Sequence, residues 1–167
     1  SQGSDIGLFG GLLGWDADDP RLGESARHLE EAGVELEIRI ERLDDPHPNT
    51  YRLTLWRGGV EHRMVAISTG GGMIEVVDID GHKVRMFGDY AATLLEVDGD
   101  GAAISEELAE WADEVHVSGD DPALVVVNGQ SFLDQADIAK LPGIRRARRI
   151  RAVLPVGSSK GMAVPFL

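Results

Sequence analysis

The sequence predicts an α+β fold with a mixed, largely antiparallel sheet, and two observations support this prediction. First, one helical pattern is followed by several alternating strand patterns that tight turns join. Second, from about residue 89 strand and helix patterns follow one another in the order βαββαβ. That order is the ferredoxin-like plan, which hosts many unrelated functions, so the order alone says nothing about activity.

The first part of the chain begins with one predicted amphipathic helix. Asp19 and Pro20 are typical of an N-cap followed by proline at the first helical position, and Gly33 is a plausible C-terminal cap. Residues 34–41 then alternate strictly between apolar and charged side chains, which is the period of a half-buried strand. The apolar face of this expected strand carries Val34, Leu36, Ile38 and Ile40.

Two hairpins are expected next. The alternation resumes at Tyr51, and the glycine pair at 58–59 supplies a turn through which the chain returns. Residues 73–87 form the second expected hairpin, which turns at Asp80-Gly81.

The βαββαβ unit is expected over residues 89–156, after a first domain of residues 1–88, and residues 157–167 are interpreted as a linker or docking tail. The six elements are, in order, "AATLLEV", a helix marked by Ile104, Leu108 and Trp111, "DEVHVSG", "PALVVVNG", a helix that Ser131 and Asp134 open, and "RRIRAVLPV". A nearly continuous apolar run is typical of a buried central strand, so Val125, Val126 and Val127 are expected inside.

Composition excludes several classes of function. The chain of 167 residues contains no Cys, which excludes disulfides, a thiol nucleophile and thiolate ligation of zinc or an iron-sulfur cluster by this chain. The net charge of -13 argues against a nucleic acid or an acidic membrane as partner. No apolar run reaches the length of a membrane span and no signal peptide is recognisable, so a soluble, cytoplasmic protein is expected.

A histidine and an asparagine stand beside two prolines in "DDPHPNTYRL". Pro46 and Pro48 fix their own φ and restrict the preceding residue, so His47 and Asn49 project from a stiff connection. Imidazole and carboxamide together can donate to a carboxylate and accept from an ammonium or a hydroxyl, the groups that an amino acid presents. The alternative is a turn in which these side chains only satisfy local backbone groups.

A run of three glycines interrupts the strand patterns in "ISTGGGMIEV". Consecutive glycines permit positive φ and close backbone approach, which suits either a ligand cradle or a bulge or sharp corner in the sheet. It is not a nucleotide loop, because a strand pattern rather than a helix follows.

Other candidate groups are weaker. The basic run at 145–151 lies at a strand start in an acidic chain, so we interpret it as a solvated or partner-facing strand rather than a nucleic-acid patch. The remaining histidines show no metal-ligand spacing; they are His28, His62, His82 and His116.

Four ordered segments together resemble the beta chain of the iron-sulfur L-serine dehydratases. They are "GLLGWDADDPRL", "DDPHPNTYRL", "STGGGMIEVVDIDGHKVRM" and "GDYAATLLEV". In that family an allosteric substrate-binding domain is followed by an ACT domain, so the resemblance implies the first for residues 1–88 and the second for residues 89–156. The ACT-like part has "DGDGAAIS" where the family has a Pro-Gly effector loop, and no ligand is carried over to that part.

The resemblance implies a role in the deamination of L-serine to pyruvate and ammonia. The family performs this reaction on a 4Fe-4S cluster whose Cys ligands lie in an alpha chain or domain, so this chain is expected to hold no cofactor and to be inert alone. The family's His-x-Asn effector motif is matched by His47 and Asn49, which implies L-serine binding there. Its Ser-x-Gly-Gly-Gly segment is matched by Ser68, Gly70, Gly71 and Gly72.

The expected partners are therefore L-serine, a cluster-bearing alpha chain or domain, and further copies of this chain in a homo-oligomer. The family's beta chain normally begins further upstream, so a partial first domain is expected. Two other functions remain open: a free amino-acid sensor without an enzymatic partner, and a non-catalytic assembly subunit whose site has decayed.

Overall fold

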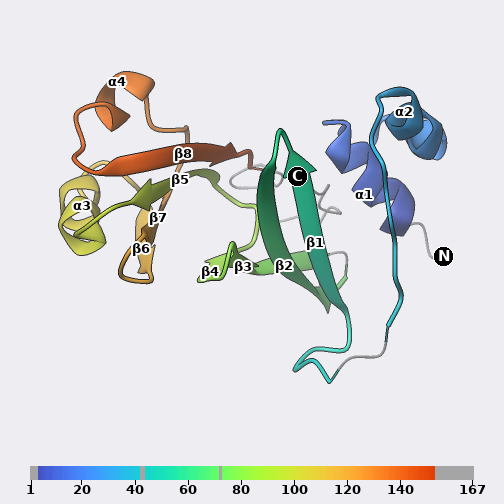
Figure 1. The fold of residues 1–167 in the computed structure, drawn as a ribbon, viewed down its shortest axis with the longest axis horizontal. Coiled ribbons are helices and arrows are strands. Elements are labelled where there is room, and N and C mark those ends of the chain that lie inside the picture. Colours follow the sequence, from blue (N-terminus) through green and yellow to red (C-terminus); the bar gives the residue numbers. More distant parts are fainter. Residues whose placement is uncertain (1–3, 42–43, 72, 153–167) are drawn as a thin grey trace.

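The computed structural model describes residues 4–41, 44–71 and 73–152 of the chain. An N-terminal helical pair is followed by two four-stranded antiparallel sheets (Figure 1). The helices are α1 (Ser4–Leu12), the 3-10 turn η1 (Leu22–Glu24), α2 (Ser25–Glu31), α3 (Gly101–Leu108) and α4 (Gln135–Ile138). The strands are β1 (Thr50–Arg57), β2 (Val60–Gly70), β3 (Met73–Ile79), β4 (His82–Met86), β5 (Ala91–Val97), β6 (Glu114–Ser118), β7 (Ala123–Gly129) and β8 (Ile144–Ile150).

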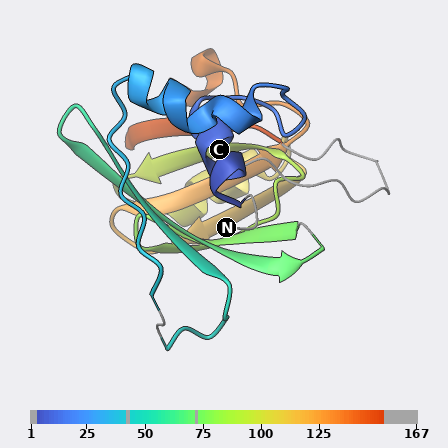
Figure 2. The same ribbon diagram turned by 90° about the vertical axis from the view of Figure 1, so that its right-hand side faces the viewer.

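The helical pair packs mainly on itself, and in Figure 2 it faces the viewer with the sheets behind it. Phe9 of α1 and Leu29 of α2 are its buried apolar side chains. The predicted helix between Asp19 and Gly33 is found as η1 and α2. Helix α1 was not predicted, because its three glycines are poor helix formers and break the amphipathic pattern. A Cβ at Gly10 would meet the end of the Leu22 side chain, so a larger residue there would require Leu22 to move.

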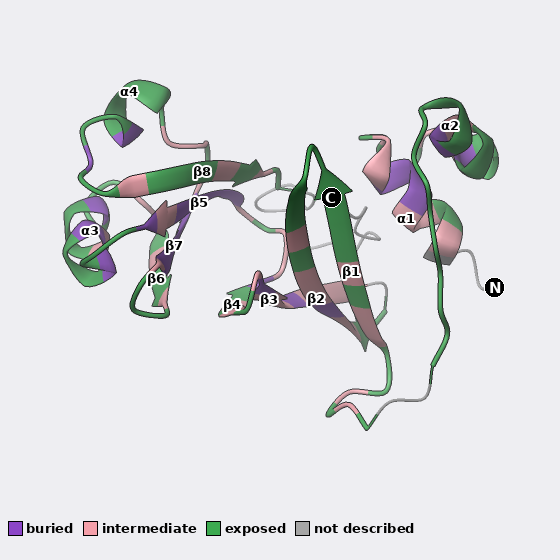
Figure 3. Ribbon diagram, in the orientation of Figure 1, coloured by how far each residue is buried: buried purple, intermediate pink, exposed green. Residues whose placement is uncertain are grey.

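The strand predicted for residues 34–41 is wrong. The segment is extended but joins no sheet, and its apolar side chains are exposed (Figure 3). Their exposed fractions are 42% for Val34, 44% for Leu36, 52% for Ile38 and 97% for Ile40. Alternation indicates which side chains share a face, but a strand also needs a neighbour for its backbone, and the described residues supply none.

The first sheet is a meander in which β1, β2, β3 and β4 pair in chain order. The predicted turns at 58–59 and at Asp80-Gly81 are confirmed, and all four residues have positive φ. The glycine run lies where β2 passes into β3, so it occupies a hairpin turn. Gly70 and Gly71 have φ of +96° and +62°, and a Cβ on either would meet nothing within 4 Å. Backbone conformation, rather than close packing, therefore explains glycine at these two positions.

The second sheet has the strand order β6-β7-β5-β8 with every pair antiparallel, which is the predicted ferredoxin-like βαββαβ arrangement. The predicted central strand is confirmed, because Val125, Val126 and Val127 are at most 4% exposed. Two details differ from the prediction. The last strand begins at Ile144, earlier than expected, and Trp111 lies beyond the end of α3 with 80% of its surface exposed.

Both faces of the second sheet are covered, because alternate residues of its strands enter different clusters. Leu95, Val125 and Val127 pack with residues of α3 and α4. The opposite face packs on the first sheet through one apolar layer, which we call the inter-sheet layer. Its buried members are Ala66, Val76, Ile79 and Met86 of the first sheet, and Ala92, Leu94, Leu124 and Val126 of the second. The predicted division into two domains between residues 88 and 89 stays a prediction. Residues from both predicted domains contribute to the inter-sheet layer.

A charged cluster at the edge of the inter-sheet layer connects the same two sheets. Asp80, in the β3–β4 turn, forms an ion pair of 2.7 Å with Arg148 of β8. Its carboxylate also accepts a 2.7 Å hydrogen bond from the Arg63 backbone N–H. The His62 ring lies 3.3 Å from Asp80 and 3.2 Å from Arg148. Through Arg148, the basic strand β8 is thus joined to the first sheet of the same chain, while the interpretation of the run at 145–151 as a solvated or partner-facing strand stays a prediction.

The pKa of Asp80 lies below its ordinary value. Burial acts in the opposite direction and is outweighed by the Arg63 backbone N–H and the charge of Arg148. Hydrogen bonds from His62 and Arg148 lower the pKa further. The charged form is thus preferred in the folded protein, so this carboxylate stabilises the fold above its unfolded pKa, and the contribution is lost as the pH falls through the folded pKa.

Asp80→Asn tests this cluster without breaking the turn, since asparagine also tolerates the positive φ of 53° found at position 80. We expect the free energy of unfolding to fall by about 1 kcal/mol at neutral pH, measured by urea denaturation. The difference from the unchanged chain should shrink as the pH falls below 3.8, the ordinary value for this group. Asp98→Asn is the control, because Asp98 and its partner Arg145 are both about half exposed, and it should cost no more than about 0.5 kcal/mol. Equal losses in both variants at every pH would contradict the assignment.

Candidate functional site

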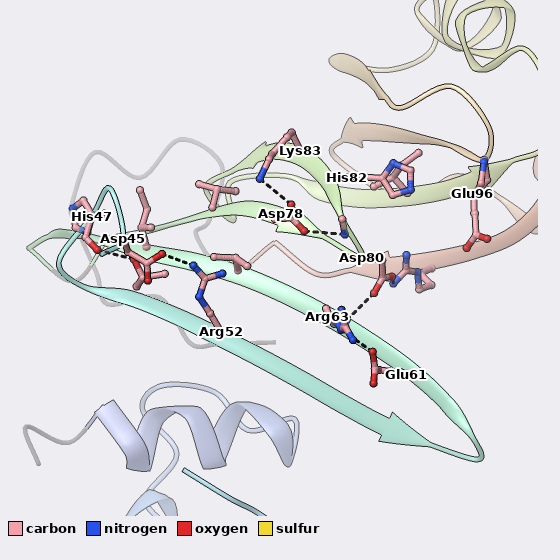
Figure 4. Close-up of a pocket in the computed structure, with 18 of the residues that line it drawn as sticks. Asp45, His47, Arg52, Glu61, Arg63, Asp78, Asp80, His82, Lys83 and Glu96 are labelled. Carbon is pink, nitrogen blue, oxygen red and sulfur yellow. Dashed lines mark hydrogen bonds and ion pairs between the residues drawn. The ribbon is translucent and has the colours of Figure 1, made fainter. Parts of the chain in front are cut away.

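A cavity of about 870 Å³ opens between the first sheet and the edge of the second. His47 and Asp45 line it from the loop before β1, while Glu96, Arg146 and other groups line it from the second sheet (Figure 4). The floor between them is formed by the β2 residues Val65 and Ile67. The cavity therefore joins the predicted histidine to residues about a hundred positions later in the chain.

The loop that carries His47 is held by short-range hydrogen bonds. The His47 Nδ1 accepts from the Asn49 backbone N–H at 3.2 Å, and the Thr50 hydroxyl donates to the His47 carbonyl at 2.7 Å. Asp45, in the same loop, forms an ion pair with Arg52 of β1. The local hydrogen bonds expected of a turn are thus present, and the half-buried His47 ring also lines the cavity.

The hydrogen bond to Nδ1 determines which ring nitrogen carries the proton. Because Nδ1 accepts, the neutral His47 ring must hold its hydrogen on Nε2. Nε2–H is then a donor suited to an anionic oxygen. The loop geometry therefore selects one neutral tautomer of His47.

Asn49 and the serine-glycine segment lie at the same end of the first sheet. The Ser68 backbone N–H donates to the Asn49 carbonyl at 2.9 Å, and Thr50 pairs with Ile67 in the ladder. The Asn49 side chain is exposed and does not line the cavity, and neither do Ser68, Gly70 and Gly71. Gly72 lies outside the described residues. Ser68 and Asn49 are thus joined by a backbone hydrogen bond. Of the predicted site residues that the structure describes, only His47 lines the cavity.

Most charged groups along the cavity are paired with one another. Lys83 lies 3.1 Å from Asp78. Arg63 lies 2.7 Å from Glu61. Arg146 is different, because the contact found for its guanidinium is a 3.5 Å approach to the His62 ring. The cavity therefore offers positive and negative groups side by side, a lining suited to a small polar molecule that carries both charges.

Sequence reasoning missed the groups contributed by the second sheet, namely Glu96, Arg146 and Arg148. They reach the cavity only because the two sheets pack face to face. The sequence feature that pointed to these residues was the basic run at 145–151. A partner-facing strand was one of its two interpretations, but the run does not indicate which surface it faces.

The described part of the chain contains no group of three or more His, Cys, Asp or Glu side chains arranged to hold a metal ion. None of the helices in this part is long and apolar enough to cross a membrane.

No protein-family model matches the chain. Its sequence is similar to a "Probable L-serine dehydratase, beta chain" of Bacillus subtilis (strain 168), with 29% identity over 161 residues, which cover 89% of this chain and 73% of the relative. It is also similar to an "L-serine dehydratase, beta chain" of Peptoniphilus asaccharolyticus, with 33% identity over 97 residues, 57% of this chain and 44% of that relative. The resemblance predicted from the four ordered segments is thus confirmed, since the chain is similar to two L-serine dehydratase beta chains.

Proposed function

We propose that the chain is the regulatory, L-serine-binding beta part of an iron-sulfur L-serine dehydratase in the cytoplasm. The enzyme would convert L-serine to pyruvate and ammonia, and the 4Fe-4S chemistry would take place in a partner chain or domain. The observation that carries this proposal is the similarity to two L-serine dehydratase beta chains, one of which matches 89% of this chain. Residues 89–156 would form the ACT-type domain of this regulatory part.

The donor set of this chain does not fit the cluster itself. Thiolate sulfur is the usual ligand of a 4Fe-4S cluster, and the sequence contains no Cys. We therefore assign the cluster to the partner and derive no chemical step in this chain.

The His47 loop is the proposed serine site. Its Nε2–H would donate to the serine carboxylate, because Nδ1 is already used by the Asn49 backbone. The Asn49 carboxamide, two residues further on, can donate to the carboxylate or accept from the ammonium or the hydroxyl. Backbone groups near Ser68 and the glycines at 70–72 are the third proposed contribution, supported by the bond between Ser68 and Asn49.

The second candidate function is a non-catalytic assembly subunit that binds no effector. It is favoured by the hydrogen bond that the His47 ring accepts within its own loop and by the exposed Asn49 side chain. Calorimetric titration with a panel of amino acids separates the two candidates, because only the first requires heat from L-serine binding.

His47→Ala and Asn49→Ala should each weaken L-serine binding about ten- to a hundredfold, since each removes a hydrogen bond to a charged ligand group. Titration calorimetry of the full chain measures this loss, and circular dichroism checks that the fold is kept. His116→Ala is the matched control, because its ring is exposed on β6 and lies outside the cavity. Unchanged affinity for L-serine in both variants would show that the loop is a structural turn and not a serine site.

The isolated chain should produce no pyruvate from L-serine. It has no Cys to hold a cluster, and we find no acid, base and electrophile set that could expel a β-hydroxyl. A coupled assay for pyruvate, run on metal-free protein, measures this directly. Pyruvate production that persists after metal removal and rises in proportion to the concentration of the chain would overturn the assignment.

A further inference from the structure

The 34–41 segment joins no sheet among the described residues and exposes an apolar face. Its four apolar side chains are 42–97% exposed, although their alternation is that of a strand with one buried face. Glu37 and Arg39 form an ion pair of 2.6 Å, so these alternate residues share the opposite, polar side. The Val34 backbone N–H donates to the Leu29 carbonyl at 3.0 Å, but the described residues supply the segment with no neighbouring strand. An extended chain with one apolar face and no neighbouring strand is a template for another strand. The segment runs separately from the sheets in Figure 1.

We propose that residues 34–40 form a two-stranded antiparallel ribbon with the same residues of a second copy of this chain. The two-fold axis passes through Glu37, which lies opposite Glu37 of the other copy. In this register the apolar residues pair with apolar residues, Val34 opposite Ile40 and Leu36 opposite Ile38. The apolar side chains of both copies then lie on the same side of the ribbon, where each contacts its cross-strand neighbour.

Charge complementarity selects this register. Glu35 lies opposite Arg39 of the other copy, and the symmetry forms this attractive pair twice. The facing Glu37 pair is repulsive, and each Glu37 is offset by the Arg39 that already lies 2.6 Å away. Moving the axis to Ile38 would also form two attractive pairs, Glu37 with Arg39, but it would place Glu35 opposite Glu41 twice, against the single Glu37 pair of the proposed register. Moving it to Leu36 would place Glu35 opposite Glu37 twice. A shift that pairs odd with even positions would oppose apolar and charged faces.

A second copy is favoured over the chain's own β1 as the occupant. In the structure β1 pairs with β2 alone, and the 34–41 segment makes no ladder with it. Helix α2 precedes the segment in the chain, and the loop that carries Pro46 and Pro48 follows it before β1. A seven-residue ribbon is small, so the dimer should dissociate on dilution.

Sedimentation equilibrium of the full chain over a range of concentrations provides the first test. We expect a monomer–dimer equilibrium whose dissociation constant rises by about tenfold or more in Ile38→Lys, which places a charge in the apolar face. The control is Leu55→Lys, an equally polar change on β1, where Leu55 is 40% exposed, and it should leave the equilibrium unchanged. A monomer at every concentration, an unaffected Ile38→Lys variant, or equal disruption by Leu55→Lys would overturn the proposal.

Charge reversal tests the register. Glu35→Arg places two arginines opposite each other and Arg39→Glu places two glutamates opposite each other, so each variant should dimerise several-fold more weakly. An equimolar mixture restores both attractive pairs in the heterodimer, so association should recover. Failure of the mixture to recover would overturn the register. The proposal does not depend on serine binding, so the calorimetric and sedimentation experiments can fail separately.

Discussion

The inter-sheet layer is the constraint on which the rest of this structure depends. Ala66 of β2 and Leu94 and Leu124 of the second sheet are at most 1% exposed within it, so each sheet buries this face against the other. Strand β2 has eleven residues, and its length gives it two roles. One half enters the layer, while the Ser68 end holds the Asn49 loop by a backbone bond. The position of the candidate site is therefore determined by the packing of the two sheets.

Polar contacts at the edge of this layer fix the relative orientation of the two sheets, whereas the apolar contacts supply most of the stability. Apolar burial is indifferent to orientation, whereas the ion pair between Asp80 and Arg148 forms only when the β3–β4 turn lies over β8. The His82 ring adds a second fixed point at 3.0 Å from the Ser118 carbonyl of β6. Of the β8 arginines, Arg148 forms an ion pair with the first sheet, whereas Arg145 pairs with Glu96 and Asp98 beside it in the second sheet.

Local chemistry allowed much of the fold to be predicted, and long-range packing limited the rest. Turn glycines, strand alternation and the apolar run of β7 each act over a few residues, so both hairpins and the buried strand could be identified. The 34–41 segment has an equally clear alternation, but a pattern cannot indicate whether a neighbouring strand exists. The cavity combines His47, which residue types suggested, with Arg146, which only sheet packing brings near. Asn49 was predicted beside His47, yet its side chain is exposed and lies outside the cavity, because the two residues stand in a bend rather than in a strand.

The inter-sheet layer also restricts how the two sheets can move relative to each other. Opening them as a hinge would place Leu94, Leu124 and Val126 in water, and these side chains are now at most 2% exposed. Sliding keeps the apolar faces in contact, so shear is the less costly motion. Side chains that interdigitate resist continuous displacement and favour discrete steps. Any motion between the two sheets would therefore take the form of a small, stepwise change in sheet registry, and the ion pair between Asp80 and Arg148 would have to break with it.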